Sequence, residues 1–180
     1  MLSKIRVIAG KYRGRNVHWR HENIRPTPSI MRERLFNWIQ FEVKDKACID
    51  LFSGSGILGI EALSRGAKHC TFVDINVSIC NMIAENLDNF RCPNENFLVL
   101  RETIPSTLTL SRKPEIIFCD PPYNLKEMRN LIRWLDVSFD GAMLYFESRK
   151  RPAFPENWQV LKSAKQGQCN SWLIKIGKHD

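Results

Sequence analysis

Short apolar segments alternate with helix-length segments through most of this 180-residue chain, and this alternation constrains the fold more than any other feature. The apolar segments are too uniformly hydrophobic for strands with one wet face, so they are typical of a parallel sheet that helices cover on both faces. Strands are predicted at residues 47–52, 69–73, 97–100, 115–119 and 143–146, helices at 57–65, 77–89 and 126–135, and a closing antiparallel hairpin at 158–163 and 171–176. We therefore predict an α/β fold.

The N-terminal end is basic and has the pattern of a β-hairpin. Residues 1–34 carry nine Lys or Arg against two Glu, a net charge of +7, whereas the remaining 146 residues carry +1. Alternating segments at 4–9 and 15–19 flank a turn-rich loop, which predicts the hairpin. Lys and Arg release counterions from phosphates, so this end suits a polyanion such as a nucleic acid, although a solvated arm without a specific partner has the same composition. The candidate RNA contacts of the loop are Lys11, Arg13 and Arg15.

A predicted linker separates this hairpin from the rest of the chain. Residues 23–28 hold two prolines and favour extended backbone, after which a helix is predicted over 29–40. We place a domain boundary there, between an RNA-binding appendage of residues 1–22 and a main body of residues 23–180.

Composition narrows the class of protein further. No apolar run approaches the ~20 residues of a membrane span, and no charged-then-apolar leader is evident, so we expect a soluble, cytoplasmic protein without a membrane partner. The six cysteines include no C-x-x-C pair and no Cys/His spacing of the kind that zinc sites use. We therefore expect no metal.

A glycine-rich turn follows the first strand of the main body. The strand ends in Asp50-Leu51-Phe52-Ser53-Gly54-Ser55-Gly56 and leads directly into a helix. Glycines at such a junction let a ligand approach the backbone, and the helix N-terminus offers N–H groups. Because Gly54, Gly56 and Gly59 have the spacing of a dinucleotide site, spacing alone does not separate a dehydrogenase from a methyltransferase.

Two carboxylates help to make that distinction. Asp50 stands just before the glycine turn, where its charge would repel a pyrophosphate but can bind the amino group of a methionine-like moiety. Asp74 closes the second strand of the body, 24 residues after Asp50, where a ribose-binding carboxylate belongs in either class. The position of Asp50 therefore disfavours a dinucleotide.

The motif Asp120-Pro121-Pro122-Tyr123 directly follows the predicted strand 115–119. An exocyclic amino group on a nucleobase is a poor nucleophile because its lone pair is delocalised into the ring. The Asp120 carboxylate and the Pro121 carbonyl can accept its two N–H bonds and aim the lone pair at a methyl donor, while Tyr123 stacks on the base. The prolines keep this loop rigid. We predict that these four residues, Asp120, Pro121, Pro122 and Tyr123, form the catalytic loop.

The sequence resembles the bacterial small-subunit ribosomal RNA guanine-N2 methyltransferases, the group that modifies guanine 966 of 16S rRNA. The segments that carry this resemblance are Asp50–Ala67, Asp120–Tyr123, Arg25–Ile39 and Gly10–Arg15. The resemblance covers nearly the whole chain. It implies a Rossmann-like class I methyltransferase fold with a mostly parallel seven-stranded sheet. It also implies S-adenosyl-L-methionine as the donor and transfer to the exocyclic N2 of one guanine.

The resemblance further implies roles for individual residues. The implied cofactor contacts are Asp50, Phe52, Ser53, Gly54, Gly56 and Asp74. Similar proteins carry Asn or Asp after the third strand to hold the adenine amino group, where this chain has Glu102, whose longer side chain can take that role. Arg25 and Arg32 lie in the stretch that flanks donor and substrate in the family, and we add both as candidate RNA contacts.

Two alternative functions stay open. An adenine-N6 methyltransferase would present the same kind of amine to the catalytic loop, although we expect no separate domain for reading a duplex. A non-enzymatic RNA-binding assembly factor is disfavoured because the glycines and the catalytic loop are intact. The expected partner is small-subunit ribosomal RNA or the assembling small subunit, and we expect a monomer.

Overall fold

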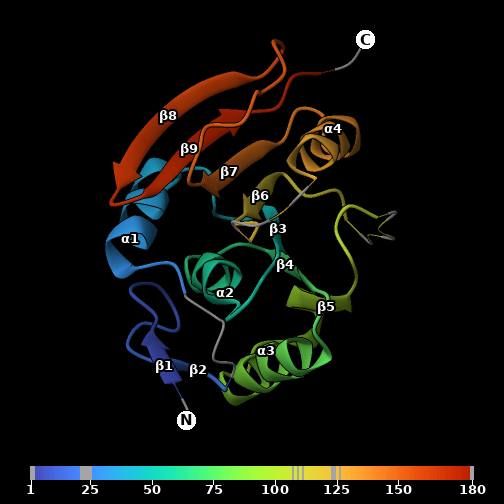
Figure 1. Ribbon diagram of the computed structural model, residues 1–180. Coiled ribbons are helices and arrows are strands. Elements are labelled where there is room, and N and C mark those ends of the chain that lie inside the picture. Colours follow the sequence, from blue (N-terminus) through green and yellow to red (C-terminus); the bar gives the residue numbers. More distant parts are fainter. Residues whose placement is uncertain are drawn as a thin grey trace.

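The computed structural model describes residues 3–20, 26–106, 108, 110, 112–122, 125 and 127–178 (Figure 1). Along the chain its elements are β1 (Ser3–Arg6), β2 (Asn16–Trp19), α1 (Ser29–Trp38), β3 (Ala47–Leu51), α2 (Ile57–Ser64), β4 (His69–Asp74), α3 (Val77–Asn89), the 3-10 turn η1 (Asn94–Asn96), β5 (Phe97–Arg101), β6 (Ile116–Cys119), α4 (Met128–Ser138), β7 (Met143–Ser148), β8 (Gln159–Gln166) and β9 (Cys169–Lys175). Strands β3 to β9 form one sheet, and β1 and β2 form a separate hairpin.

The seven-stranded sheet has the order β5-β4-β3-β6-β7-β9-β8. Strands β5, β4, β3, β6 and β7 are parallel, and β9 is antiparallel to both of its neighbours, β7 and β8. Every residue of the central strands β3 and β6 is buried, which explains why these segments are apolar in the sequence apart from Asp50. The predicted α/β fold with a mostly parallel seven-stranded sheet is confirmed.

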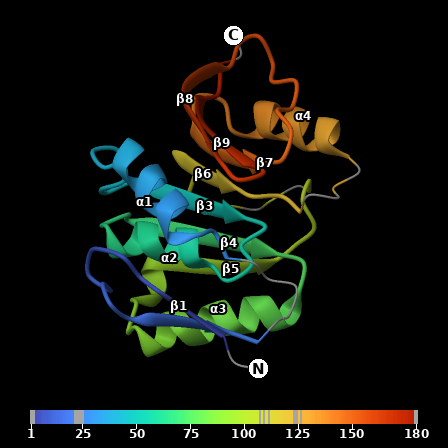
Figure 2. The same cartoon turned by 60° about the vertical axis from the view of Figure 1, so that its left-hand side comes forward.

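Helices cover both faces of the sheet (Figure 2). On one face α1, α2 and α3 pack against side chains that include Cys48 and Phe118. On the other face α4 packs against Ile49 and Ile117. Because successive residues of a strand point to opposite faces, the neighbours Cys48 and Ile49 enter different cores.

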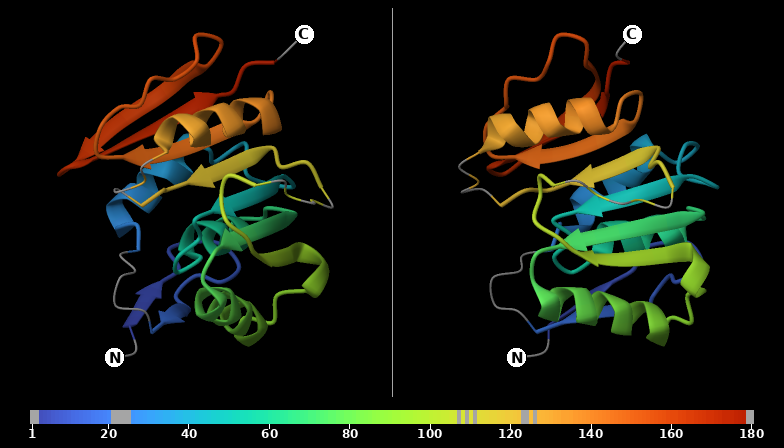
Figure 3. Two further views of the ribbon diagram at one scale, coloured as in Figure 1. Left: turned by 45° about the vertical axis from the view of Figure 1, so that its right-hand side comes forward. Right: turned by 90° about the vertical axis from the view of Figure 1, so that its right-hand side faces the viewer.

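The N-terminal hairpin packs beside α3 and over α2 (Figure 3). Its side chains Val7, Tyr12 and Val17 are buried in the same core as these two helices. The hairpin loop is also held by Ser64, the last residue of α2. The Lys11 N–H donates to the Ser64 carbonyl at 2.7 Å, and the Tyr12 N–H donates to Ser64 Oγ at 2.9 Å.

The close approach of loop and helix leaves no room for a side chain at position 10. A Cβ atom on Gly10, whose φ is +82°, would lie 1.8 Å from the carbonyl oxygen of Ser64. The loop therefore requires glycine at this position both for its backbone conformation and for space. Residues 21–25, which include the predicted boundary between residues 22 and 23, lie outside the described residues, and this domain boundary stays a prediction.

Element boundaries lie within about three residues of the predicted ones, and one of the larger differences has a physical cause. The helix predicted over 77–89 is α3, with the same bounds. Strand β1, however, ends at Arg6 rather than at residue 9. The N–H groups of Ile8 and Ala9 donate to the carboxylate of Glu61 instead of to a neighbouring strand. A side chain of α2 thus ends the ladder.

Among the helices within the described ranges, none combines the length and apolar character needed to cross a lipid bilayer.

Candidate active site

A cavity of about 710 Å³ lies at the carboxyl ends of β3, β4, β6 and β7. Loops and helix N-termini meet at this edge of a parallel sheet, so ligands of α/β proteins bind there. The wall of the cavity includes Asp50, Gly54, Asp74, Asp120 and Glu147. Its volume is in the range of small-molecule and cofactor sites. The cavity therefore brings the glycine turn and the predicted catalytic loop together.

The turn between β3 and α2 presents backbone to this cavity. Phe52, Gly54 and Gly56 have left-handed backbone, with φ values of 59°, 52° and 72°. Gly56 immediately precedes α2, and a Cβ atom there would lie 3.0 Å from the Ile83 side chain. Phe52, Ser53 and Gly54 line the cavity, whereas Gly56 shapes the turn without reaching the cavity wall.

Asp50 is buried at the carboxyl end of β3 and faces the cavity. Its Oδ2 atom accepts a hydrogen bond from the Gly59 N–H at 2.9 Å. Burial raises the pKa of Asp50 to about 8; the nearby Asp74 carboxylate adds to the rise, and the Gly59 bond opposes it. A cationic ligand group would stabilise the ionised carboxylate, so this position suits an amine.

Asp74, at the end of β4, is anchored to the glycine turn. Its Oδ2 accepts from the Gly54 N–H at 3.0 Å, and its Oδ1 accepts from the Asn76 N–H at 2.9 Å. Ser53 joins the same strand ends, because its N–H donates to the Val73 carbonyl at 3.0 Å and its Oγ accepts from the Val73 N–H at 2.9 Å. These bonds hold the Asp74 carboxylate at the cavity wall with lone pairs available for hydroxyl donors.

Glu102 is not on the wall of this cavity. It is exposed just after β5, where its N–H donates to the Asp74 carbonyl at 3.1 Å. Ile75 and Ile79, which the sequence pattern did not indicate, line this side instead. Apolar side chains of this kind suit the face of a flat ring. The adenine contact of Glu102 stays a prediction.

The predicted catalytic loop begins where β6 ends. The sheet register pairs Leu51 of β3 with Cys119 of β6, so the glycine turn and this loop start at the same level of the sheet. Asp120, Pro121 and Pro122 line the cavity. Tyr123, the fourth residue of the motif, lies outside the described residues.

The electrostatics of the loop involve a residue that sequence reasoning missed. Burial raises the pKa of Asp120, and the carboxylates of Glu147 and Asp50 raise it further. Glu147 is 2% exposed on β7 and lines the cavity. One signal could have identified it, because an acidic residue at the end of an otherwise apolar strand needs a partner or a ligand.

The predicted RNA contacts of the hairpin loop are exposed. Lys11, Arg13 and Arg15 all lie at the surface. The Arg15 guanidinium is stacked 4.6 Å from the centroid of the Phe90 ring and donates to the Asn89 carbonyl at 2.8 Å. These two contacts fix the orientation of the Arg15 guanidinium, and its remaining N–H groups stay accessible to a phosphate.

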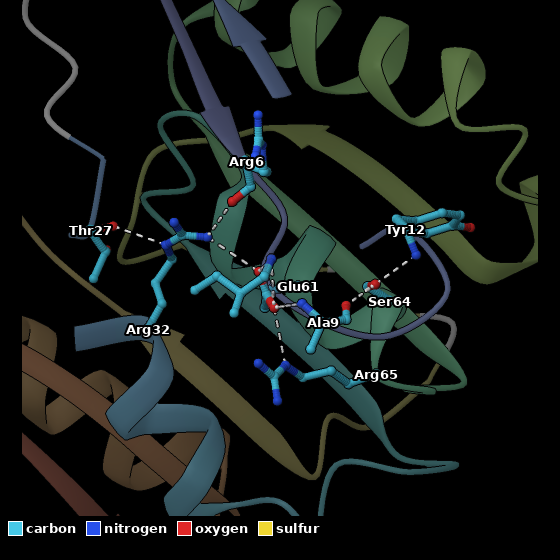
Figure 4. Close-up of polar contacts among 9 residues, drawn as sticks. Arg6, Ala9, Tyr12, Thr27, Arg32, Glu61, Ser64 and Arg65 are labelled. Carbon is cyan, nitrogen blue, oxygen red and sulfur yellow. Dashed lines mark hydrogen bonds and ion pairs between the residues drawn. The ribbon is translucent and has the colours of Figure 1, made fainter. Parts of the chain in front are cut away.

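Arg32 was predicted to contact RNA, and the structure corrects this assignment. The residue is 2% exposed, and its Nη1 donates to Glu61 Oε2 at 3.2 Å and to the Arg6 carbonyl at 3.1 Å, while its Nε donates to the Thr27 carbonyl at 3.1 Å (Figure 4). A guanidinium bonded on several sides within the protein is not available to a phosphate. Arg25, which belongs to the predicted linker, lies outside the described residues.

Glu61 is the centre of this network (Figure 4). The carboxylate is fully buried and accepts from the N–H groups of Ile8 and Ala9, at 3.0 Å each, and from Nε of Arg65 at 3.1 Å, in addition to Arg32. The network joins the hairpin, α1 and α2. Because the Thr27 segment bonded to Arg32 also lines the cavity, the same bonds position one wall of the site.

Comparisons with known proteins identify the family of this chain. Residues 5–175 match the family model "Conserved hypothetical protein 95". Ribosomal RNA small subunit methyltransferase D of Haemophilus influenzae is 34% identical over 179 residues, covering 91% of this chain and 90% of that protein. The protein of the same name from Escherichia coli K12 is 35% identical over 173 residues, covering 92% and 86%. The solved structure of Escherichia coli yhhF aligns with a TM-score of 0.85 at 32% identity, over 98% of this chain and all of the other. These matches confirm the predicted family, and the chain belongs to the ribosomal RNA small subunit methyltransferase D family.

Proposed function

We propose that this protein transfers a methyl group from S-adenosyl-L-methionine to the exocyclic N2 of a guanine in small-subunit ribosomal RNA, guanine 966 of 16S rRNA, in the cytoplasm. The observation that carries the proposal is the single cavity whose wall includes both the glycine turn with Asp50 and Asp74 and the loop Asp120–Pro122. The proposed sites for the methyl donor and for the reacting amine thus lie in the same cavity.

The residues present fit the proposed donor. In this assignment Asp50 binds the amino group of the methionine moiety, because its buried carboxylate is stabilised by a positive partner. Asp74 accepts hydrogen bonds from the ribose hydroxyls, and the apolar side chains of Ile75 and Ile79 cover the adenine ring. When bound, the donor supplies an electrophilic methyl group on a positively charged sulfonium.

The loop Asp120–Pro122 acts on the acceptor. The Asp120 carboxylate and the Pro121 carbonyl accept the two N–H bonds of the guanine amine and orient its lone pair toward the methyl group. The nitrogen–methyl bond forms as the sulfur–methyl bond breaks, and the surplus proton on the nitrogen then leaves to Asp120 or to water. Catalysis here depends on orientation more than on strong acid or base chemistry.

The proposed function is tested by mapping the methylated nucleotide. Purified protein is incubated with labelled S-adenosyl-L-methionine and either naked 16S rRNA or small subunits from cells that lack this protein. We expect a single methylated guanine, assigned to N2 by mass spectrometry of nuclease digests. Methylation of adenine instead would favour the adenine-N6 alternative. No transfer to either substrate by folded protein that binds RNA would favour the assembly factor.

The exposed arginines of the hairpin loop are expected to dock the RNA. Replacing Arg13 and Arg15 together by alanine should weaken RNA binding and reduce the slope of log K against log salt concentration by about one unit for each phosphate that these arginines neutralise in the wild type. The matched control is the double alanine variant of Arg129 and Arg133, which are exposed on α4 over the opposite face of the sheet. Equal salt slopes for both double variants would show that the hairpin is not the docking surface.

A further inference from the structure

Glu147 and Asp120 are neighbours at the carboxyl ends of adjacent parallel strands. The register pairs Cys119, the last residue of β6, with Phe146 of β7, so Asp120, which directly follows β6, lies beside Glu147 of β7. Neighbouring residues in register point to the same face of a sheet, with the strands about 4.8 Å apart. Both side chains line the same cavity. Two hydrogen-bond-accepting carboxylates are thus adjacent where the base that receives the methyl group is expected to bind.

The Glu147 carboxylate is held in a defined orientation. The Tyr145 hydroxyl donates to Oε1 at 2.7 Å, and the Cys169 thiol donates to Oε2 at 3.4 Å. An ionised carboxylate offers about four acceptor positions, so these two bonds orient the group without using all its lone pairs. Burial raises the pKa of Glu147, and hydrogen-bond donors from a ligand would favour its ionised form.

The edge of guanine fits this pair of acceptors, and the edge of adenine does not. On guanine the N1–H bond and the adjacent N–H bond of the 2-amino group point in the same direction, so two donors stand side by side. On adenine the 6-amino group stands beside an unprotonated N1, which carries a lone pair. A carboxylate beside the reacting amine therefore attracts the guanine edge and repels the adenine edge.

We propose that Glu147 accepts a hydrogen bond from N1–H of the target base and so selects guanine, while Asp120 and the Pro121 carbonyl hold the reacting amine. This inference rests on the proposed function and adds a specificity-determining residue to it. It also accounts for an acidic side chain that is buried at the cavity wall.

The test uses a base that keeps the reacting amine but lacks the N1–H donor; because this base also lacks the 6-oxo group of guanine, the preference is compared between variants. Two substrates are prepared in the form, naked or assembled, that the mapping experiment identifies, with guanine or 2-aminopurine at the target position. 2-Aminopurine retains the 2-amino group, but its N1 is an unprotonated acceptor. The kcat/KM ratio and the ratio of dissociation constants for the two substrates are measured for the wild type, Glu147→Gln and Glu147→Asp.

The wild type is expected to prefer guanine by at least about 100-fold. Glu147→Gln, whose amide can donate to the unprotonated N1, should reduce this preference at least about tenfold, whereas Glu147→Asp should retain a preference for guanine. The matched control is Glu115→Gln, which changes an exposed glutamate at the opposite end of β6 and should keep the wild-type ratio.

Three results would overturn the inference. If Glu147→Gln keeps the wild-type affinity, turnover and preference for guanine, Glu147 does not read the base. If it weakens binding and turnover of both substrates equally, its role is structural only. Because affinity is measured without turnover, an inactive variant still gives an answer. If the wild type methylates neither base, the proposed function fails together with this inference.

Discussion

Replacing Asp120 by alanine is expected to lower kcat for methyl transfer by at least about two orders of magnitude, which is the usual cost of losing one precisely positioned hydrogen-bond partner of the reacting group. The carboxylate lies at the cavity wall directly after β6, and without it the amine has only the Pro121 carbonyl to orient it. Donor affinity should change little, because the donor is assigned to Asp50 and Asp74. Single-turnover kinetics and calorimetric titration with S-adenosyl-L-methionine measure the two quantities separately.

A conservative variant makes this prediction specific. Asp120→Asn keeps a carbonyl oxygen that can accept one N–H bond, so its rate should lie between those of the wild type and Asp120→Ala. The catalytic assignment would be wrong if Asp120→Ala retained full turnover. It would also be wrong if the variant lost rate only in proportion to weaker donor binding, since the carboxylate would then serve the donor.

Glu61→Ala is expected to lower the free energy of unfolding by about 3–5 kcal/mol, the cost typical of removing one partner from a buried ion pair. The variant leaves the Arg32 guanidinium buried without its carboxylate, and it also leaves the N–H groups of Ile8 and Ala9 without their acceptor. Urea denaturation monitored by circular dichroism measures the change, provided that the m-value stays constant.

The control for this prediction is the same substitution at an exposed position. Glu85 lies on the surface of α3, so Glu85→Ala should leave the free energy of unfolding almost unchanged. Glu61→Gln keeps one acceptor oxygen but not the charge, so its loss in the free energy of unfolding should lie between those of Glu61→Ala and Glu85→Ala. A loss below about 1 kcal/mol for Glu61→Ala would show that water or a rearranged Arg32 replaces the carboxylate.

The motifs at the carboxyl edge of the sheet could be predicted because each combines a backbone requirement with a chemical group. Gly56 must adopt a left-handed backbone, and the two prolines beside Asp120 must end a strand rigidly, so both segments carry their geometry in their residue types. Parallel topology then brings the ends of β3 and β6 to one edge, and this follows from the apolar pattern alone.

Arg32 and Glu147 show where this reasoning fails. Arginine and glutamate are mostly exposed, so neither residue type indicates burial. Helical spacing did contain a signal for Arg32, since Leu35, Phe36 and Ile39 follow it at intervals of three, four and seven residues and all are buried. The spacing does not identify Glu61 as the partner of Arg32. Glu61 lies 29 positions away and contacts Arg32 only because α1 packs on α2.

Helix α2 has consequences for how a folded RNA is chosen. Its first turn follows the glycine turn of the cavity, and its last residue, Ser64, holds the cationic loop through two hydrogen bonds and a close approach to Gly10. Eight helical residues span about 12 Å and do not stretch. If the hairpin loop docks the RNA as proposed, α2 fixes the position of the docked RNA relative to the cavity, so only an RNA whose own fold presents the reactive base at the cavity would be modified.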